Sequence, residues 1–170
     1  MSGLQRIHTR LHGFSRFIRW HNDGILLGMD RGIQTVTTGS GEIAPVVLVV
    51  DDSPDARAMY GEYLRFCGFR VVTAKNGEEG VAAAHAEWPA VIVMDLQMPQ
   101  MDGWEAIRHL RQDPLTAEIP IIALSAFAFG DAPDRARKAG ADLCLSKPCP
   151  PPQVARVVRA MLFSSRDSSH

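Results

Sequence analysis

The stretch VVLVVDDSPD, Val46 to Asp55, joins a run of aliphatic residues to two adjacent acids. Consecutive aliphatic residues that end at turn-forming residues are typical of a strand buried on both faces. Pro54 suits the first turn of a following helix, where its missing N–H costs nothing. The stretch therefore predicts a strand, a turn and a helix. Asp51 and Asp52 in the turn either cap that helix or belong to a binding site.

The same alternation continues to the end of the chain. Helical patterns cover Pro54 to a stop at Gly68, then residues 77–87, 104–111, 134–139 and 150–163. Aliphatic runs between them predict strands at residues 69–74, 90–95, 119–126 and 141–146. Five strands that alternate with five helices predict the α/β class, a doubly wound five-stranded parallel sheet covered on both faces.

Composition narrows the functional classes. The chain has 170 residues, 46% hydrophobic and 22% charged, with a formal net charge of −1, so a strong field for nucleic acid is not expected. The three cysteines lack metal-ligand spacing and predict reduced thiols. No apolar run approaches the roughly 20 residues of a membrane span. We expect a soluble cytoplasmic protein.

Polar residues gather where the predicted strands end. Asp51 and Asp52 follow the first strand, Asp95 the third, Ser125 the fourth and Lys147 the fifth. In doubly wound sheets these ends meet at one edge, where ligands bind. Three neighbouring carboxylates repel one another unless a cation neutralises them, and Mg²⁺ prefers such oxygens. A lysine and a hydroxyl beside the metal suit a tetrahedral anion, which indicates phosphoryl transfer to an aspartate.

These motifs resemble those of the response-regulator receiver domains of two-component signalling in bacteria. DD, MDLQMPQMDG, ALSA and SKP occur in the family's order over about Pro45 to Phe163. The resemblance implies a flavodoxin-like, CheY-like fold in which Asp95 is the phosphorylated residue. It also implies residues that bind Mg²⁺, with Asp52 direct, Asp51 through water, and Asp95 and the Gln97 carbonyl as further ligands. Lys147 would bind the phosphoryl group, before a cis peptide bond to Pro148.

Other positions tune the site in the family. Ser125 is the switch hydroxyl, and Cys144 stands where an aromatic residue usually turns inward. We expect Ser125 to move on phosphorylation, with a smaller surface change or one that uses Phe127 or Phe129. Gln97 and Phe127 occupy the positions that tune loss of the phosphoryl group, and bulky Phe127 predicts a persistent aspartyl phosphate. Asp102 is expected to cap the following helix rather than bind metal.

The function implied is a single-domain response regulator in a phosphorelay, a phosphoacceptor rather than a conventional enzyme, which catalyses its own phosphorylation and dephosphorylation. Its phosphoryl donor would be a sensor histidine kinase or a histidine phosphotransfer protein. Output would run through an unknown downstream protein or through the N-terminal stretch, without direct DNA binding. The fourth helix, fifth strand and fifth helix form the candidate face for a dimer. The alternative is a receiver-shaped interaction module whose output is independent of phosphorylation. Aspartate-nucleophile phosphohydrolases are disfavoured, because Ser53 breaks their DxD pattern.

The two ends of the chain carry weaker signals. Residues 1–44 hold five arginines and apolar residues at near-helical spacing, which predicts a basic amphipathic helix. A disordered leader, or translation that begins at Met29, explains the same segment. Residues 37–42 (TTGSGE) are typical of a flexible linker, and residues 164–170 are expected to be a disordered tail.

Overall fold

The computed structural model describes residues 6–11, 14–21, 24–28, 44–126 and 132–167. The chain divides into two units, Met1–Ala44 and Pro45–His170. The predicted linker at residues 37–42 and the two loop aromatics, Phe127 and Phe129, lie outside the described residues.

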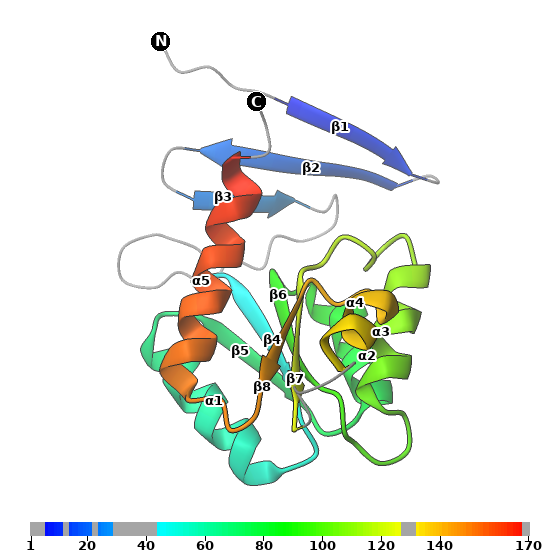
Figure 1. Ribbon diagram of the computed structural model, residues 1–170. Helices are drawn as coiled ribbons and strands as arrows, with labels where there is room; N and C mark the ends of the chain where they lie inside the picture. The colour runs from blue at the N-terminus through cyan, green and yellow to red at the C-terminus, as the bar shows by residue number, and fades with distance from the viewer. Residues whose placement is uncertain (1–5, 12–13, 22–23, 29–43, 127–131, 168–170) are drawn as a thin grey trace. The chain divides into compact units, whose positions relative to one another are not determined.

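The larger unit is built on a five-stranded parallel sheet (Figure 1). Its strands stand in the order β5-β4-β6-β7-β8, so the first strand of this unit lies second in the sheet. Their bounds are β4 Val46–Val50, β5 Arg70–Ala74, β6 Val91–Asp95, β7 Ile121–Ser125 and β8 Leu143–Ser146. All five predicted strands are confirmed, and the doubly wound fold with them.

Five helices connect the strands and cover the sheet. They are α1 Pro54–Phe66, α2 Gly77–Glu87, α3 Gly103–Gln112, α4 Ala132–Ala139 and α5 Pro151–Asp167. Within the described residues, no helix is both long enough and apolar enough to cross a membrane.

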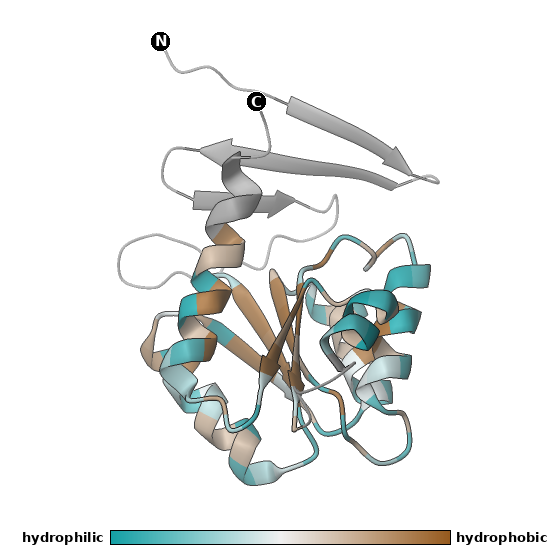
Figure 2. Cartoon of the chain, in the orientation of Figure 1, coloured by the Kyte–Doolittle hydropathy of each residue, from teal (hydrophilic) through white to brown (hydrophobic). Residues whose placement is uncertain are grey.

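Two hydrophobic cores lie on opposite faces of the sheet. Successive β4 residues alternate between them: Leu48 and Val50 pack toward α2, α3 and α4, and Val47 and Val49 toward α1 and α5. This alternation follows from the period of two in a strand. The strands of the larger unit are mostly hydrophobic and the outer faces of its helices are more hydrophilic (Figure 2), as expected when both faces of a sheet are covered.

Local residue choices fix where the helices begin and end. Ser53, Asn76 and Asp102 are the N-caps of α1, α2 and α3, and each side-chain oxygen accepts a hydrogen bond from a first-turn N–H. The predicted capping role of Asp102 is confirmed. Gly68 has a φ of +92°, a left-handed conformation that costs glycine little, and it follows the end of α1 as predicted.

The last helix is longer than predicted. α5 extends to Asp167, so the tail expected to be disordered from residue 164 is helical through residue 167. Ser164, Ser165 and Arg166 include neither proline nor glycine, and nothing in the local sequence stops the helix.

The smaller unit differs from the prediction. Its described residues form an antiparallel sheet of β1 Arg6–Leu11, β2 Phe14–His21 and β3 Gly24–Gly28. A helical segment is therefore the wrong prediction for these residues. Aromatic and β-branched residues in β1 and β2 favour strands, and the Asn22–Asp23–Gly24 run is a hairpin signal that the helical spacing obscured.

Candidate functional site

Strand register brings the acids together at the carboxyl end of the sheet. β4 pairs with β6 so that Val50 lies beside Met94. One residue further along, Asp51 lies beside Asp95. The chain passes from β4 to β5 on one side and then returns to β6 on the other, so these two strands flank the point where the strand order reverses. Doubly wound sheets bind their ligands at that point.

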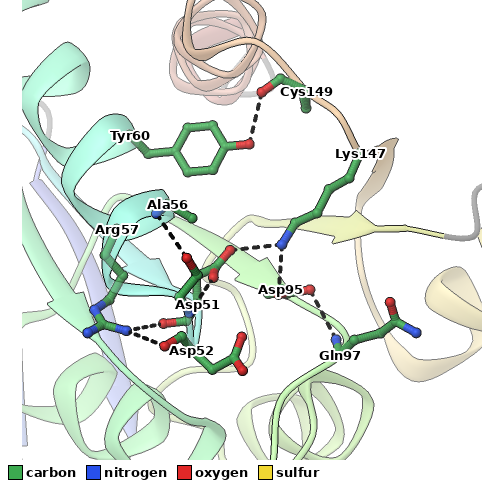
Figure 3. A network of polar contacts seen from close by, with 10 residues as sticks. Asp51, Asp52, Ala56, Arg57, Tyr60, Asp95, Gln97, Lys147 and Cys149 are labelled. Atoms are coloured by element: carbon green, nitrogen blue, oxygen red, sulfur yellow. Dashed lines mark hydrogen bonds and ion pairs between the residues drawn. The ribbon is translucent and has the colours of Figure 1, made fainter.

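Lys147 joins the two buried acids. Its Nζ lies 2.9 Å from Asp51 Oδ2 and 2.7 Å from Asp95 Oδ2 (Figure 3). Its backbone N–H donates to the Ser125 carbonyl at 2.8 Å, which fixes the start of the segment after β8. Ser125 itself is 2% exposed at the end of β7. The structure therefore brings the predicted phosphoacceptor, lysine and switch hydroxyl to one edge.

Three carboxylates form a cluster with the composition of a metal site. One oxygen from each of Asp51, Asp52 and Asp95 can be chosen so that all lie within 4.8 Å of one another. Asp51 and Asp95 are 1% and 4% exposed, whereas Asp52 is exposed. Within the described part of the chain, no donor bonds the Asp52 carboxylate. A hard divalent cation such as Mg²⁺ fits this donor set, which leaves ligand oxygens open at the surface.

The adjacent acids do not cap α1. Ser53 is the N-cap, and its backbone N–H donates to Asp51 Oδ1 at 2.9 Å. The capping interpretation of Asp51 and Asp52 is therefore wrong, because the serine that follows them performs that role.

Burial and charge act in opposite directions on the two partners of the central ion pair. Burial raises the pKa of Asp95 above its usual value, although hydrogen bonds from Lys147 and Gln97 partly offset this effect. Burial by itself lowers the pKa of Lys147, but its bonds to Asp95 and Asp51 outweigh that effect and leave the pKa raised. Lys147 is thus held in its charged form beside a carboxyl group whose ionisation burial opposes, so a cation bound next to Asp95 would lower the pKa of that carboxyl group.

The loop after Asp95 lies close to the cluster. The Gln97 N–H donates to Asp95 Oδ1 at 3.0 Å, so the residue predicted to offer its carbonyl to the metal also holds the phosphoacceptor. Gly103 stands where the loop enters α3, a position at which a glycine is expected to allow a turn. Its φ is not in the left-handed region, but a Cβ would overlap the Asp95 carbonyl oxygen. Close backbone approach, rather than a turn, excludes a side chain.

Cys144 and Pro148 lie on the last strand and just after it. Cys144 is half-buried in β8, pairs with Ala123 and packs against the core under α3 and α4. Burial raises the pKa of its thiol. The Lys147–Pro148 peptide bond is cis, the isomer that the resemblance implied.

Two further residues support the site and were not found from the sequence. Arg57 Nη1 donates to the carbonyls of Asp51 at 2.6 Å and Asp52 at 3.0 Å. The Tyr60 hydroxyl donates to the Cys149 carbonyl at 2.9 Å (Figure 3). The helical spacing of apolar residues indicates that Tyr60 belongs to the core, but it predicts no role for Arg57. Both side chains bond to backbone carbonyls, and hydrophobic periodicity does not predict such bonds.

Known proteins are similar to this chain in sequence and in fold. The family model of the response regulator receiver domain matches residues 47–159. A probable transcriptional regulator, ycf27, of Guillardia theta is 37% identical over 118 residues, which cover 68% of this chain and 44% of that protein. The polar-differentiation response regulator DivK of Brucella anthropi is 28% identical over 68% of this chain and 94% of its own length. This chain therefore spans less than half of the ycf27 relative.

Solved structures agree with the family match. The chemotaxis response regulator CheY4 of Vibrio cholerae superposes with a TM-score of 0.66 at 30% identity, over 69% of this chain and 98% of that one. The beryllofluoride-activated DrrB receiver domain superposes with a TM-score of 0.63 at 27% identity, over 71% and 98%.

The chain belongs to the response regulator receiver domain family. Receiver domains are phosphoacceptor modules of two-component signalling rather than conventional enzymes. Its acidic cluster is compatible with Mg²⁺.

Proposed function

We propose that this protein receives a phosphoryl group on Asp95 in a Mg²⁺-dependent step and signals through contact with another protein. The observation that carries the proposal is the position of Lys147, whose ammonium bridges Asp51 and Asp95 beside the exposed Asp52. Such an arrangement supplies a nucleophilic carboxylate, a fixed positive charge and open ligand oxygens at one point.

The phosphoryl donor that we propose is a phosphohistidine on a sensor histidine kinase or a histidine phosphotransfer protein. An Asp95 carboxylate oxygen attacks phosphorus in line, the P–N bond breaks, and its electron pair returns to the imidazole. Mg²⁺, held by Asp51 through water and by Asp52, Asp95 and the Gln97 carbonyl, would neutralise charge on the transferring oxygens. Lys147 exchanges its contact with the carboxylate for one with the phosphoryl group, and Ser125 donates from the neighbouring strand end.

Loss of the phosphoryl group by hydrolysis is proposed to take place at the same site, with Gln97 and Phe127 as tuning positions. Output is proposed to run through the surface of α4, β8 and α5, by a downstream protein or by dimerisation. Leu143 of β8 is an exposed large hydrophobic residue on this surface. A cytoplasmic location follows from the proposed donors.

The direct test is phosphorylation by acetyl phosphate with Mg²⁺, followed by intact mass. We expect a gain of one phosphoryl group that is lost in base and absent in Asp95→Asn. Asp102→Asn is the matched control, because asparagine also caps α3 and the acid removed lies in the same loop. Labelling of Asp102→Asn at the wild-type rate, with none in Asp95→Asn, assigns the acceptor.

Cys144 supports a second candidate, an interaction module whose output does not depend on phosphorylation. A thiol at this position lacks the volume of an aromatic switch. The two candidates differ in one result: wild-type protein that stays unlabelled with acetyl phosphate and with kinases, at saturating Mg²⁺, contradicts the first and supports the second.

A further inference from the structure

The loop between β6 and α3, residues 96–102, is closed at its base by the backbone. The Gly103 N–H donates to the Leu96 carbonyl at 3.2 Å, and the Asp102 side chain accepts from Glu105 N–H at 2.8 Å. These bonds fix where the loop leaves β6 and where it enters α3. Gln97, the second residue of the loop, is held by the bond from its N–H to Asp95 Oδ1, but none of these bonds reaches the middle of the loop as far as Gln100.

A second set of bonds, from the start of α2, holds that middle. Asn76 Nδ2 donates to Gln100 Oε1 at 2.9 Å, and the Gly77 N–H donates to the Met101 carbonyl at 3.2 Å. Asn76 is only 8% exposed, and its Oδ1 caps α2 through Glu79 N–H at 2.8 Å. One buried amide thus anchors a helix with its oxygen and a loop with its nitrogen. We call the Asn76–Gln100 hydrogen bond the clamp.

The clamp stabilises a backbone that is otherwise unfavourable. Gln100 has a φ of 67°, a left-handed conformation that is unfavourable for a residue with a side chain. A loop released from the clamp gains by returning this residue to negative φ. Because Gln97 lies three residues earlier, such a change moves the groups around Asp95.

Gly77 shows how closely the two segments approach. A Cβ at this position would lie 2.6 Å from the Met101 carbonyl oxygen and 2.7 Å from its Cγ. The backbone at the start of α2 is therefore in direct contact with the loop, and no side chain fits at position 77. The clamp therefore joins two segments whose backbones already pack against each other at Gly77 and Met101.

We propose that Asn76 and Gln100 are positioning residues of the Mg²⁺ site, because their clamp fixes the loop that carries Gln97. This inference rests on the proposed function, in which the Gln97 carbonyl is a metal ligand. Removal of a group that orients a metal ligand typically weakens metal affinity by about 10- to 100-fold.

Two single variants and their combination test the clamp. Gln100→Met removes the acceptor on an exposed loop residue at similar volume, and Asn76→Ser removes the amide donor but keeps an oxygen to cap α2. We expect each to raise the Mg²⁺ Kd, measured by calorimetry, about tenfold. We expect the double variant to resemble either single one, because both break the same bond.

Thr116→Val is the matched control. Its hydroxyl donates to the Leu110 carbonyl at 2.8 Å in a fully buried position at the far end of α3, so it removes a buried hydrogen bond away from the cluster. It should lower stability and leave the Mg²⁺ Kd unchanged. Clamp variants that change the Kd no more than Thr116→Val overturn the proposal, and so do single effects that multiply in the double variant.

A measurement without metal separates this inference from the proposed function. The Gln97 amide donates to Asp95 Oδ1, so its hydrogen exchange, followed by NMR in the absence of Mg²⁺, reports the order of the loop. We expect exchange several-fold faster in both clamp variants and unchanged in Thr116→Val. A wild type that fails to bind Mg²⁺ contradicts the proposed function and the metal role of the clamp. Unchanged Gln97 exchange contradicts the clamp alone.

Discussion

The two ends of the parallel sheet both carry a half-buried basic residue, but the two networks differ in how many of their polar groups are hydrogen-bonded. At the amino end, Arg111 donates to the carbonyls of Gly140, Ala117 and Ile119 at 2.7–2.8 Å, and to Asp142 Oδ2 at 2.8 Å. Asp142 Oδ2 also accepts from Ile121 N–H at 2.7 Å. Arg111 therefore donates to three backbone carbonyls and one carboxylate, and that carboxylate, Asp142, accepts from both Arg111 and a backbone N–H.

At the carboxyl end, Lys147 is shared between Asp51 and Asp95, and the third acid, Asp52, has no bonded donor within the described residues. The first network is complete and serves stability. The second contains more negative than positive charge, which leaves it open to a cation and an anion. The comparison shows that a half-buried charge by itself does not indicate function, whereas charge left unbalanced at a strand-order reversal does.

The largest expected effect is at the amino end. Arg111→Met removes four hydrogen bonds and leaves three partly buried carbonyls without this donor, so we expect the free energy of unfolding to fall by about 2–3 kcal/mol. Denaturant unfolding without metal measures this loss. The Mg²⁺ Kd should stay at the wild-type value, and a large change in that Kd would show that the two ends are coupled.

The next effect is at the carboxyl end and requires Mg²⁺. At about ten times its Kd, Mg²⁺ should raise the free energy of unfolding by about 1.4 kcal/mol, since it binds the folded state. Asp52→Asn should abolish this gain and change the metal-free stability little, because the residue is exposed. A gain that survives in Asp52→Asn would contradict its role as a ligand. Arg111→Lys is the control at the amino end, because it retains the positive charge. Mg²⁺ should stabilise this variant as much as it stabilises the wild type.

A smaller loss of stability is expected from a hydrogen bond at the carboxyl end that supports the fold but does not contact the metal site. Tyr60→Phe removes the bond to the Cys149 carbonyl and should cost about 1 kcal/mol without changing Mg²⁺ affinity. Burial raises the pKa of Tyr60, so the phenol stays neutral and the loss should be equal at pH 6 and pH 9. Unfolding at both pH values checks this, and a loss that disappears at pH 9 would show that the phenol had ionised.

The smallest expected effect is in the proton balance of Mg²⁺ binding. Because burial raises the pKa of Asp95, the metal-free protein gains stability from this group at acid pH and loses it as pH rises through that pKa. Mg²⁺ requires the carboxylate, so binding should weaken as pH falls and release a fraction of a proton in the acid range where Asp95 titrates. Calorimetry in buffers of different ionisation enthalpy measures the release. Asp95→Asn should show none.

Much of the larger unit could be predicted because its signals are local. Aliphatic runs such as Val46–Val50 mark strands buried on both faces, and a parallel sheet then brings Asp51, Asp95 and Lys147 to one edge without further information. The roles assigned to each of these residues came from the family resemblance, not from spacing.

The parts that were missed depend on pairs of distant segments or on competing patterns. The clamp joins residues 24 positions apart, and Arg57 bonds to backbone atoms, so neither leaves a periodic signal. In the first 28 residues, apolar spacing favours a helix while aromatic and β-branched residues favour strands, and the strand propensity prevails in β1, β2 and β3. The last helix continues past its predicted end because polar residues alone do not stop a helix.

The alternation in β4 has a consequence for protein engineering. Each residue advances a strand by about 3.3 Å and reverses the side of the sheet that it faces. Deleting a single residue from Val46–Val50 would exchange the layers to which Leu48 and Val49 belong, and would draw Asp51 and Asp52 back from Asp95 by that distance. The separation of the carboxylates is therefore set by the length of one strand, and insertions belong in the surface loops instead.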